Sequence, residues 1–142
     1  MNPLMFGAEI AEVDNDFVVS VRDLPEVVTS GSTLEEALAL AGDAIEVAVV
    51  GRMEDDEDLP VPSAIRDGEH AVALPAVLAA KAAVYRAWKA SGLKKAELAR
   101  KLDRNEVEIR RILNPRHGTK LDQLEEAAHA LGGRLVISFE AA

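Results

Sequence analysis

Acidic and basic residues divide this chain into two halves of opposite charge. Residues 1–74 hold 17 Asp and Glu against three Arg and no Lys, a net charge of −14. Residues 75–142 hold eight Asp and Glu against 13 Lys and Arg, a net charge of +5. This division predicts an acidic domain over 1–74 and a basic domain over 75–142, with different partners. A basic domain favours phosphate backbones and an acidic one attracts cations, unless the charges only keep both domains soluble.

The composition excludes several classes of protein. Hydrophobic residues make up 49% and charged residues 29% of 142, which indicates a globular fold rather than a disordered tail. No apolar run approaches the roughly 18 residues of a membrane span, and no secretory signal is visible, so we expect a cytoplasmic protein. The chain has no Cys, and its three His (His70, His117 and His129) are not at metal-ligand spacing. We therefore expect no metal and no cofactor.

Three stretches early in the acidic half are predicted to be β-strands, and the second of them alternates apolar and polar residues well. They are residues 5–13, 16–22 and 27–29. A turn at residues 14–16 separates the first two, and Pro25, which cannot donate to a central ladder, separates the second from the third. Because the connections are short, we expect an antiparallel meander.

A helix with a marked start follows the meander. Thr33 and Glu36 have the spacing of a capping box, in which each satisfies the other's backbone donor. The apolar stripe behind this start predicts packing across the meander, and it comprises Leu34, Ala37, Leu38, Ala41, Ile45, Ala48 and Val49. The helix runs out in five acids at 54–58, and an extended connector at 59–63 leads to a strand at 70–74. The predicted order is β-β-β-α-β.

An enzymatic interpretation of the acidic half rests on three carboxylates. Asp14, Asp16 and Asp23 are candidates for the metal-binding acids of a nuclease. Asp14 and Asp16 lie in a predicted turn, where Asp is favoured because its side chain bonds the local backbone. Turn chemistry explains them without catalysis, so we expect the protein not to be an enzyme.

The basic half reads as a helical domain. A helix opens at Pro75 and ends at Ser91 and Gly92, with Val77, Leu78, Val84, Tyr85 and Trp88 facing inward. Two short helices over 93–102 and 106–113, joined by a break at 103–105, have the geometry of a helix-turn-helix. Small Ala99 suits a close helix crossing, and Ile109, Ile112 and Leu113 share the inward face.

The opposite face of the second short helix predicts contact with the major groove of DNA. Arg111 suits the two acceptor atoms of guanine, Val107 a thymine methyl, and Glu106 a cytosine amino group. The loop after Pro115 has phosphate-binding character. The full set of predicted DNA-binding residues is Lys95, Asn105, Glu106, Val107, Arg110, Arg111, Asn114, Arg116, His117, Thr119 and Lys120. The alternative is a plain helical bundle with basic surface residues.

The end of the chain predicts a dimer. A last helix with Leu121, Leu124, Ala128 and Leu131 inward stops at Gly132 and Gly133, and residues 134–140 then alternate as a short β-strand. A terminal strand without a local partner leaves an unpaired edge. We expect it to pair with its copy in an isologous homodimer or a higher oligomer, through Leu135, Val136, Ile137 and Phe139.

Motifs in both halves together resemble the HicB antitoxin family in its long form, and they extend over nearly the whole chain. The motifs are Asp23-Leu24-Pro25, Thr29-Ser30-Gly31, Thr33-Leu34-Glu35-Glu36-Ala37-Leu38, Pro60-Val61-Pro62-Ser63, Leu74-Pro75-Ala76, Lys81-Ala82-Ala83-Val84-Tyr85, Lys95-Ala96-Glu97-Leu98-Ala99-Arg100 and Pro115-Arg116-His117-Gly118-Thr119-Lys120-Leu121. Three residues depart from the family pattern. Glu26 and Asp103 stand where glycine is usual, and Arg104 stands at a normally apolar position.

The resemblance implies an α+β protein: a degraded RNase H-like sheet with one helix in front, then a lambda-repressor-like helix-turn-helix domain. It also implies a type II toxin–antitoxin pair, in which the chain blocks HicA, a small basic RNA-cleaving toxin, and represses their operon by binding operator DNA. The acidic residues that we expect at the toxin are Asp14, Asp16, Asp23, Glu26, Glu54, Asp55 and Asp56. A stand-alone transcription factor with an acidic sensor domain, and an active RNase H-like nuclease, are the alternatives.

Overall fold

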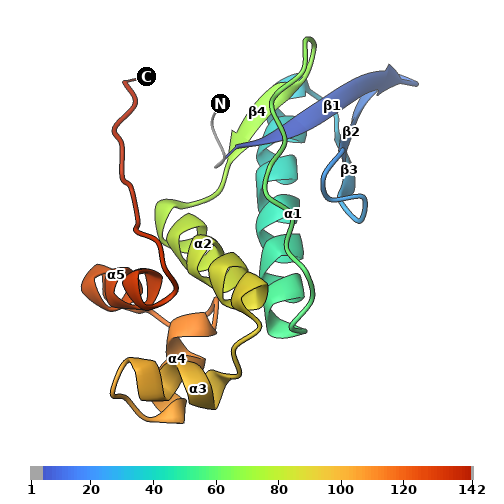
Figure 1. The fold of residues 1–142 in the computed structure, drawn as a ribbon. Helices are drawn as coiled ribbons and strands as arrows, with labels where there is room; N and C mark the ends of the chain where they lie inside the picture. The colour runs from blue at the N-terminus through green and yellow to red at the C-terminus, as the bar shows by residue number, and fades with distance from the viewer. Residues whose placement is uncertain (1–4, 142) are drawn as a thin grey trace. The chain divides into compact units, whose positions relative to one another are not determined.

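The computed structural model describes residues 5–141, which form two compact units, one reaching to Ala76 and one beginning at Val77. The acidic unit is an antiparallel sheet with one helix, and the basic unit is helical (Figure 1). Among the described residues, no helix combines the length and the hydropathy that a membrane span requires.

The sheet of the acidic unit has the order β3-β2-β1-β4. Strand β1 (Met5–Val13) pairs with β2 (Asp16–Val21), β2 pairs with β3 (Val28–Gly31), and β4 (His70–Ala73) pairs with β1, all antiparallel. Asp14 and Asn15 both have positive φ, of 50° and 68°, as a two-residue hairpin turn of the primed type requires. The predicted meander and the order β-β-β-α-β are confirmed.

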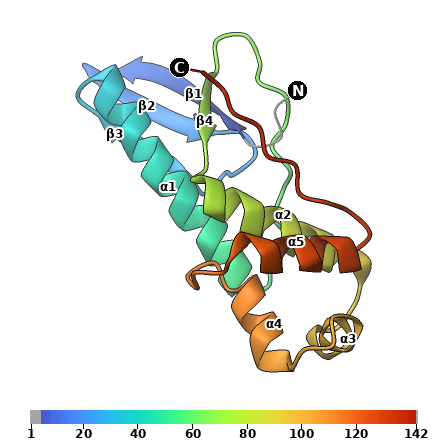
Figure 2. The same cartoon turned by 90° about the vertical axis from the view of Figure 1, so that its left-hand side faces the viewer.

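Helix α1 (Leu34–Glu54) lies across one face of this sheet (Figures 1 and 2). Its buried residues recur every four positions: Ala37, Ala41, Ile45, Val49 and Met53. The predicted stripe begins one turn too early, because Leu34 in the first turn is exposed. The capping box is only half formed: the Thr33 side chain accepts from the Glu36 amide at 3.1 Å, but the Glu36 carboxylate accepts from the Ser32 hydroxyl at 2.8 Å.

The connector between α1 and β4 is held against the sheet by polar contacts. Arg22 donates to Glu69 at 2.8 Å and to the Ala64 carbonyl at 3.1 Å. Asp23 accepts from both the amide and the hydroxyl of Ser63, at 2.8 and 2.6 Å. These bonds give a segment without regular secondary structure a fixed course beside the strands.

The basic unit contains four helices: α2 (Ala76–Ser91), α3 (Lys95–Lys101), α4 (Glu106–Leu113) and α5 (Leu121–Ala130). Its buried residues include Leu78, Tyr85, Leu98, Ile109 and Leu124. Two residues predicted to face inward are exposed. Val77 lies off the stripe that runs through Leu78, Ala82 and Tyr85, and Leu121 is the first residue of α5, ahead of its buried turn.

Residues 134–140 do not form the predicted strand in the single chain. They have no regular secondary structure (Figure 1). The side chains of Val136, Ile137 and Phe139 are exposed, that of Phe139 to 94%. A strand is defined by hydrogen bonds to a neighbour, and within the described residues this segment pairs with none.

Candidate functional site

Helices α3 and α4 pack against each other and present one face of α4 to solvent (Figure 2). Ile109, Ile112 and Leu113 are buried, as predicted, whereas Val107, Arg110 and Arg111 are exposed. Val107 is 51% exposed although it is apolar. Arg111 makes no side-chain hydrogen bond or ion pair within residues 5–141, so its five donors are available to an external acceptor.

Other predicted DNA-binding residues on α4 have partners inside the unit. Asn105 caps the helix, because its side chain accepts from the Glu108 amide at 2.9 Å. Glu106 and Arg110 form an ion pair at 2.8 Å across one turn. The Asn114 side chain accepts from the Arg116 amide at 2.9 Å. These contacts shape the helix and its ends, and Glu106 and Arg110 remain on the surface.

The remaining predicted residues flank α4. Arg116, His117 and Lys120 are exposed in or just after the loop that leads to α5, whereas the Thr119 hydroxyl contacts the Arg111 carbonyl at 3.3 Å. Lys95 begins α3, and its ammonium lies 5.5 Å from the centre of the Trp88 ring. The loop and one helix face thus gather basic groups in one unit.

The two family departures in this region have structural roles. Asp103 has a φ of 51°, in the left-handed region that favours glycine, which agrees with the glycine that the family resemblance implies at this position. Arg104 is half-buried and donates to Glu126 at 2.7 Å, with Glu108 at 3.6 Å. Arg104 thus joins α4 and α5 through ion pairs with Glu108 and Glu126.

Lys81 is a buried residue of this unit that is not predicted from the sequence to have a functional role, because a lysine on a helix is normally exposed. It is 1% exposed, and its ammonium contacts the C-terminal end of α4. Its position in the sequence does indicate burial: Lys81 lies three residues after Leu78 and four before Tyr85, on the buried stripe of α2.

In the acidic unit, the predicted acidic residues are spread over several places. Asp14 and Asp16 lie at the β1–β2 turn, and Asp23 follows the other end of β2. Glu26 is bound by Arg52, whose hydrogen bond lowers the pKa of Glu26. Glu54, Asp55 and Asp56 lie at the end of α1. Within residues 5–141 no three His, Asp or Glu gather so as to hold a metal ion.

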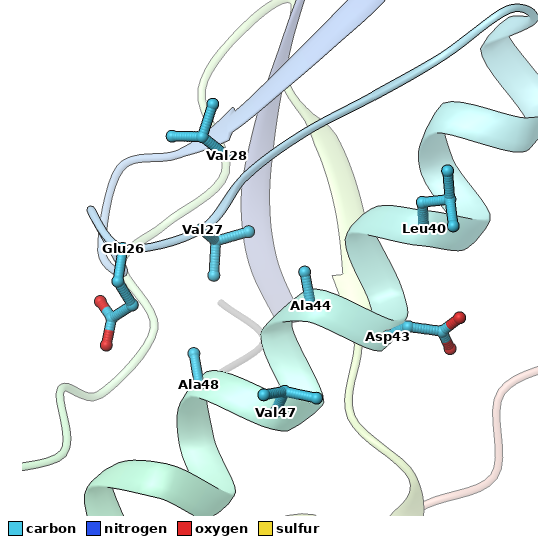
Figure 3. A pocket seen from close by; sticks show the side chains of 8 residues that line it. All are labelled: Glu26, Val27, Val28, Leu40, Asp43, Ala44, Val47 and Ala48. Carbon is cyan, nitrogen blue, oxygen red and sulfur yellow. The ribbon is translucent and has the colours of Figure 1, made fainter.

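A groove of about 420 Å³ opens between α1 and the chain that leads into β3 (Figure 3). Its lining is mostly apolar and comprises Glu26, Val27, Val28, Leu40, Asp43, Ala44, Val47 and Ala48. Val28 and Val47 are 67% and 72% exposed. Such exposed apolar side chains, bordered by carboxylates at Glu26 and Asp43, are typical of a protein-binding surface. Of these residues, only Glu26 is predicted from the sequence as a toxin contact.

Comparisons with known proteins agree over most of the chain. A family model described as the HicB-like antitoxin of a bacterial toxin–antitoxin system matches residues 6–83. Antitoxin HicB of Escherichia coli K12 is 36% identical over 122 residues, which cover 86% of this chain and 88% of that protein. Antitoxin HicB 2 of Photorhabdus laumondii is 39% identical over 86% of both chains. Antitoxin HicB of Pseudomonas fluorescens Pf0-1 is 36% identical over 96% of this chain and 94% of its own length.

These similarities define an antitoxin of a bacterial toxin–antitoxin system. The chain belongs to the HicB-like antitoxin family, as the sequence motifs predict.

Proposed function

We propose that the acidic unit binds and blocks a small basic RNA-cleaving toxin of the HicA type, and that the basic unit binds operator DNA to repress the shared operon. The observation that carries this proposal is the division of charge: −14 and +5 fall on separate stretches of an antitoxin, and these stretches correspond closely to its two compact units. An acidic unit attracts a cationic nuclease and repels nucleic acid, whereas a basic unit does the reverse.

The α1–β3 groove is the surface that best suits the toxin. It offers apolar side chains for burial, and the unit around it carries a large negative charge. Two of the three arginines of this unit, Arg22 and Arg52, are paired with Glu69 and Glu26, which leaves the other carboxylates to dominate its field. A cationic surface that presents an apolar side chain fits both features.

The exposed face of α4 suits the operator. Treated as the second helix of a helix-turn-helix, it places Val107 and Arg111 toward base edges, and Arg116, His117 and Lys120 toward phosphates. Residues 134–140 supply the dimer contact in this proposal, because pairing with the same segment of a second copy would bury their exposed apolar side chains. A dimer with two such units predicts operator DNA with two half-sites whose centres lie about 10 bp apart, or a multiple of that distance.

Toxin binding through the groove is tested with two matched substitutions in the full-length chain. Val47→Arg places a cation in the groove, whereas Val61→Arg makes the same change at an exposed residue of the same unit that does not line the groove. We expect Val47→Arg to weaken capture of the toxin encoded beside the gene by about tenfold or more. Val61→Arg should have a small effect. Equal binding by both variants would contradict the groove, and no binding by the wild type would contradict the toxin proposal itself.

A further inference from the structure

We propose that Lys81 is a positioning residue for DNA recognition, which holds the C-terminal end of α4 and the following loop from inside the basic unit. The inference rests on the proposed binding of operator DNA by α4. Lys81 does not touch DNA in this scheme. It fixes the backbone from which Arg111 and the basic loop extend.

Four hydrogen bonds join Lys81 to this region. Its Nζ donates to the carbonyl oxygens of Arg111, Ile112 and Asn114 at 3.1, 3.0 and 2.9 Å, and to the Thr119 hydroxyl at 2.7 Å. The Thr119 hydroxyl in turn contacts the Arg111 carbonyl at 3.3 Å. One buried ammonium therefore connects the last turn of α4 with both ends of the loop that follows.

Helix α4 needs such a partner because it lacks the usual C-terminal ending. The last carbonyls of any helix have no partner within the helix. In this unit α2, α3 and α5 are followed by residues with positive φ, namely Gly92, Asp103 and Gly132. The chain after α3 and α5 turns back so that the amides of Arg104 and Gly133 bond the helix carbonyls at 2.9 Å.

Helix α4 ends differently, on Asn114 in an extended conformation, with φ of −81° and ψ of 116°. Pro115 follows and has no N–H to donate. At the ends of α3 and α5, amides that follow a left-handed residue donate to the last carbonyls. At the end of α4 the ammonium of Lys81 donates to these carbonyls instead, and its positive charge also suits the negative end of the helix dipole.

The charge of Lys81 indicates a role beyond filling space. Within residues 5–141 its hydrogen-bond partners are carbonyl and hydroxyl oxygens, and none is a carboxylate. Burial lowers the pKa of Lys81 to about 8, so the amine is mostly protonated at neutral pH. An apolar side chain would fill the same volume without this cost, and would leave the end of α4 unfixed.

The test compares Lys81→Met with Arg86→Met in the full-length chain. Arg86 lies on the same helix, and its Nε is buried with no hydrogen-bond partner in the described structure, so this variant removes a similar charge but none of the four hydrogen bonds that Lys81 makes. Binding to the protein's own promoter fragment and to a scrambled fragment is measured by fluorescence anisotropy, at a temperature where circular dichroism shows both variants folded. We expect Lys81→Met to bind the promoter about tenfold more weakly and to lose its preference over the scrambled fragment.

The control and a second readout separate positioning from stability. Arg86→Met should keep the preference, and amide hydrogen exchange should accelerate at Asn114 and in the loop only in Lys81→Met. If Lys81→Met does not fold, Thr119→Val replaces it, with a smaller loss of preference expected. Preference equal to that of the wild type in the folded variant, or an equal loss in Arg86→Met, would overturn the role of Lys81. A wild-type chain that does not prefer the promoter would instead overturn the operator proposal.

Discussion

Gly31 and Gly51 are two glycines of the same unit in opposite surroundings. A Cβ built on Gly31, at the end of β3, would lie 2.6 Å from the backbone nitrogen of Ala37. A Cβ on Gly51, within α1, would meet nothing within 4 Å. The absent side chain at Gly31 is therefore what allows the first turn of α1 to approach the sheet, whereas Gly51 has no such role.

Substitution of each glycine by alanine should shift stability in opposite directions. We expect Gly31→Ala to lower the free energy of unfolding by about 1–3 kcal/mol, because the neighbouring atoms are backbone and must move together. Gly51→Ala should raise it by about 0.5–1 kcal/mol through helix propensity. Urea unfolding followed by far-UV circular dichroism measures both. Equal stability of the two variants would contradict the close approach of α1 at Gly31.

Arg111 separates the two proposed activities at a single residue. It is exposed on α4 and its side chain makes no hydrogen bond or ion pair within the described residues, so its removal should leave the fold unchanged. We expect Arg111→Ala to lose the preference for promoter over scrambled DNA, by about 1–3 kcal/mol of discrimination, and to keep full binding of the toxin. Competition anisotropy and toxin capture on the same preparation measure both. Loss of both activities together would identify Arg111 as a folding residue.

At the scale of elements, local patterns predict strands and helices better than they predict the contacts of polar side chains. The alternation of residues 17–21 and the Thr33 cap are visible in the sequence because each depends on neighbours along the chain. The fixed course of the connector depends on Arg22 and Ser63 meeting residues some 40 positions away. The hydrogen-bond partners of Lys81 are likewise not predictable from local patterns, since they lie 30 to 38 residues further along the chain.

The connector predicts a response of the acidic unit to acid. The hydrogen bond from Arg22 lowers the pKa of Glu69 below its ordinary value of 4.5. As the pH falls, Glu69 is therefore protonated in the unfolded chain before it is protonated in the folded chain. The stabilisation that the Arg22–Glu69 pair gives the fold is present above about pH 4.5 and is lost below it. The melting temperature of the wild type should fall as the pH drops below 5. We expect this fall to be smaller in Arg22→Gln than in the control variant Arg100→Gln, which changes an arginine of the other unit. Parallel curves for the two variants would show that the pair does not stabilise the fold.

The C-terminal segment predicts a change of oligomeric state. Val136, Ile137 and Phe139 are exposed in the single chain, and we propose that a second copy covers them. Deletion of residues 134–142 should convert the dimer into a monomer in multi-angle light scattering, and should weaken binding to a two-half-site promoter more than to one half-site. A truncated chain that still forms a dimer would place the dimer contact elsewhere.

At the scale of the whole molecule, the opposite charges of the units support the proposal that one chain binds two partners of opposite charge. A basic nuclease and an anionic operator attract each other nonspecifically, and under this proposal the separation of −14 from +5 along the chain would direct each partner to its own unit. The composition predicts this division, but not the surfaces. The apolar lining of the α1–β3 groove is contributed by residues that read in the sequence as an ordinary helix and strand.

Co-expression of the full-length chain with the small protein encoded beside its gene tests the antitoxin function most directly. Affinity capture and mass spectrometry identify what is bound, and growth reports whether it is neutralised. We predict recovery of a small basic protein that arrests growth when expressed alone, and normal growth when the chain, or its Arg111→Ala variant, is present. Recovery of no partner, or growth arrest that persists with the chain present, would contradict the antitoxin function.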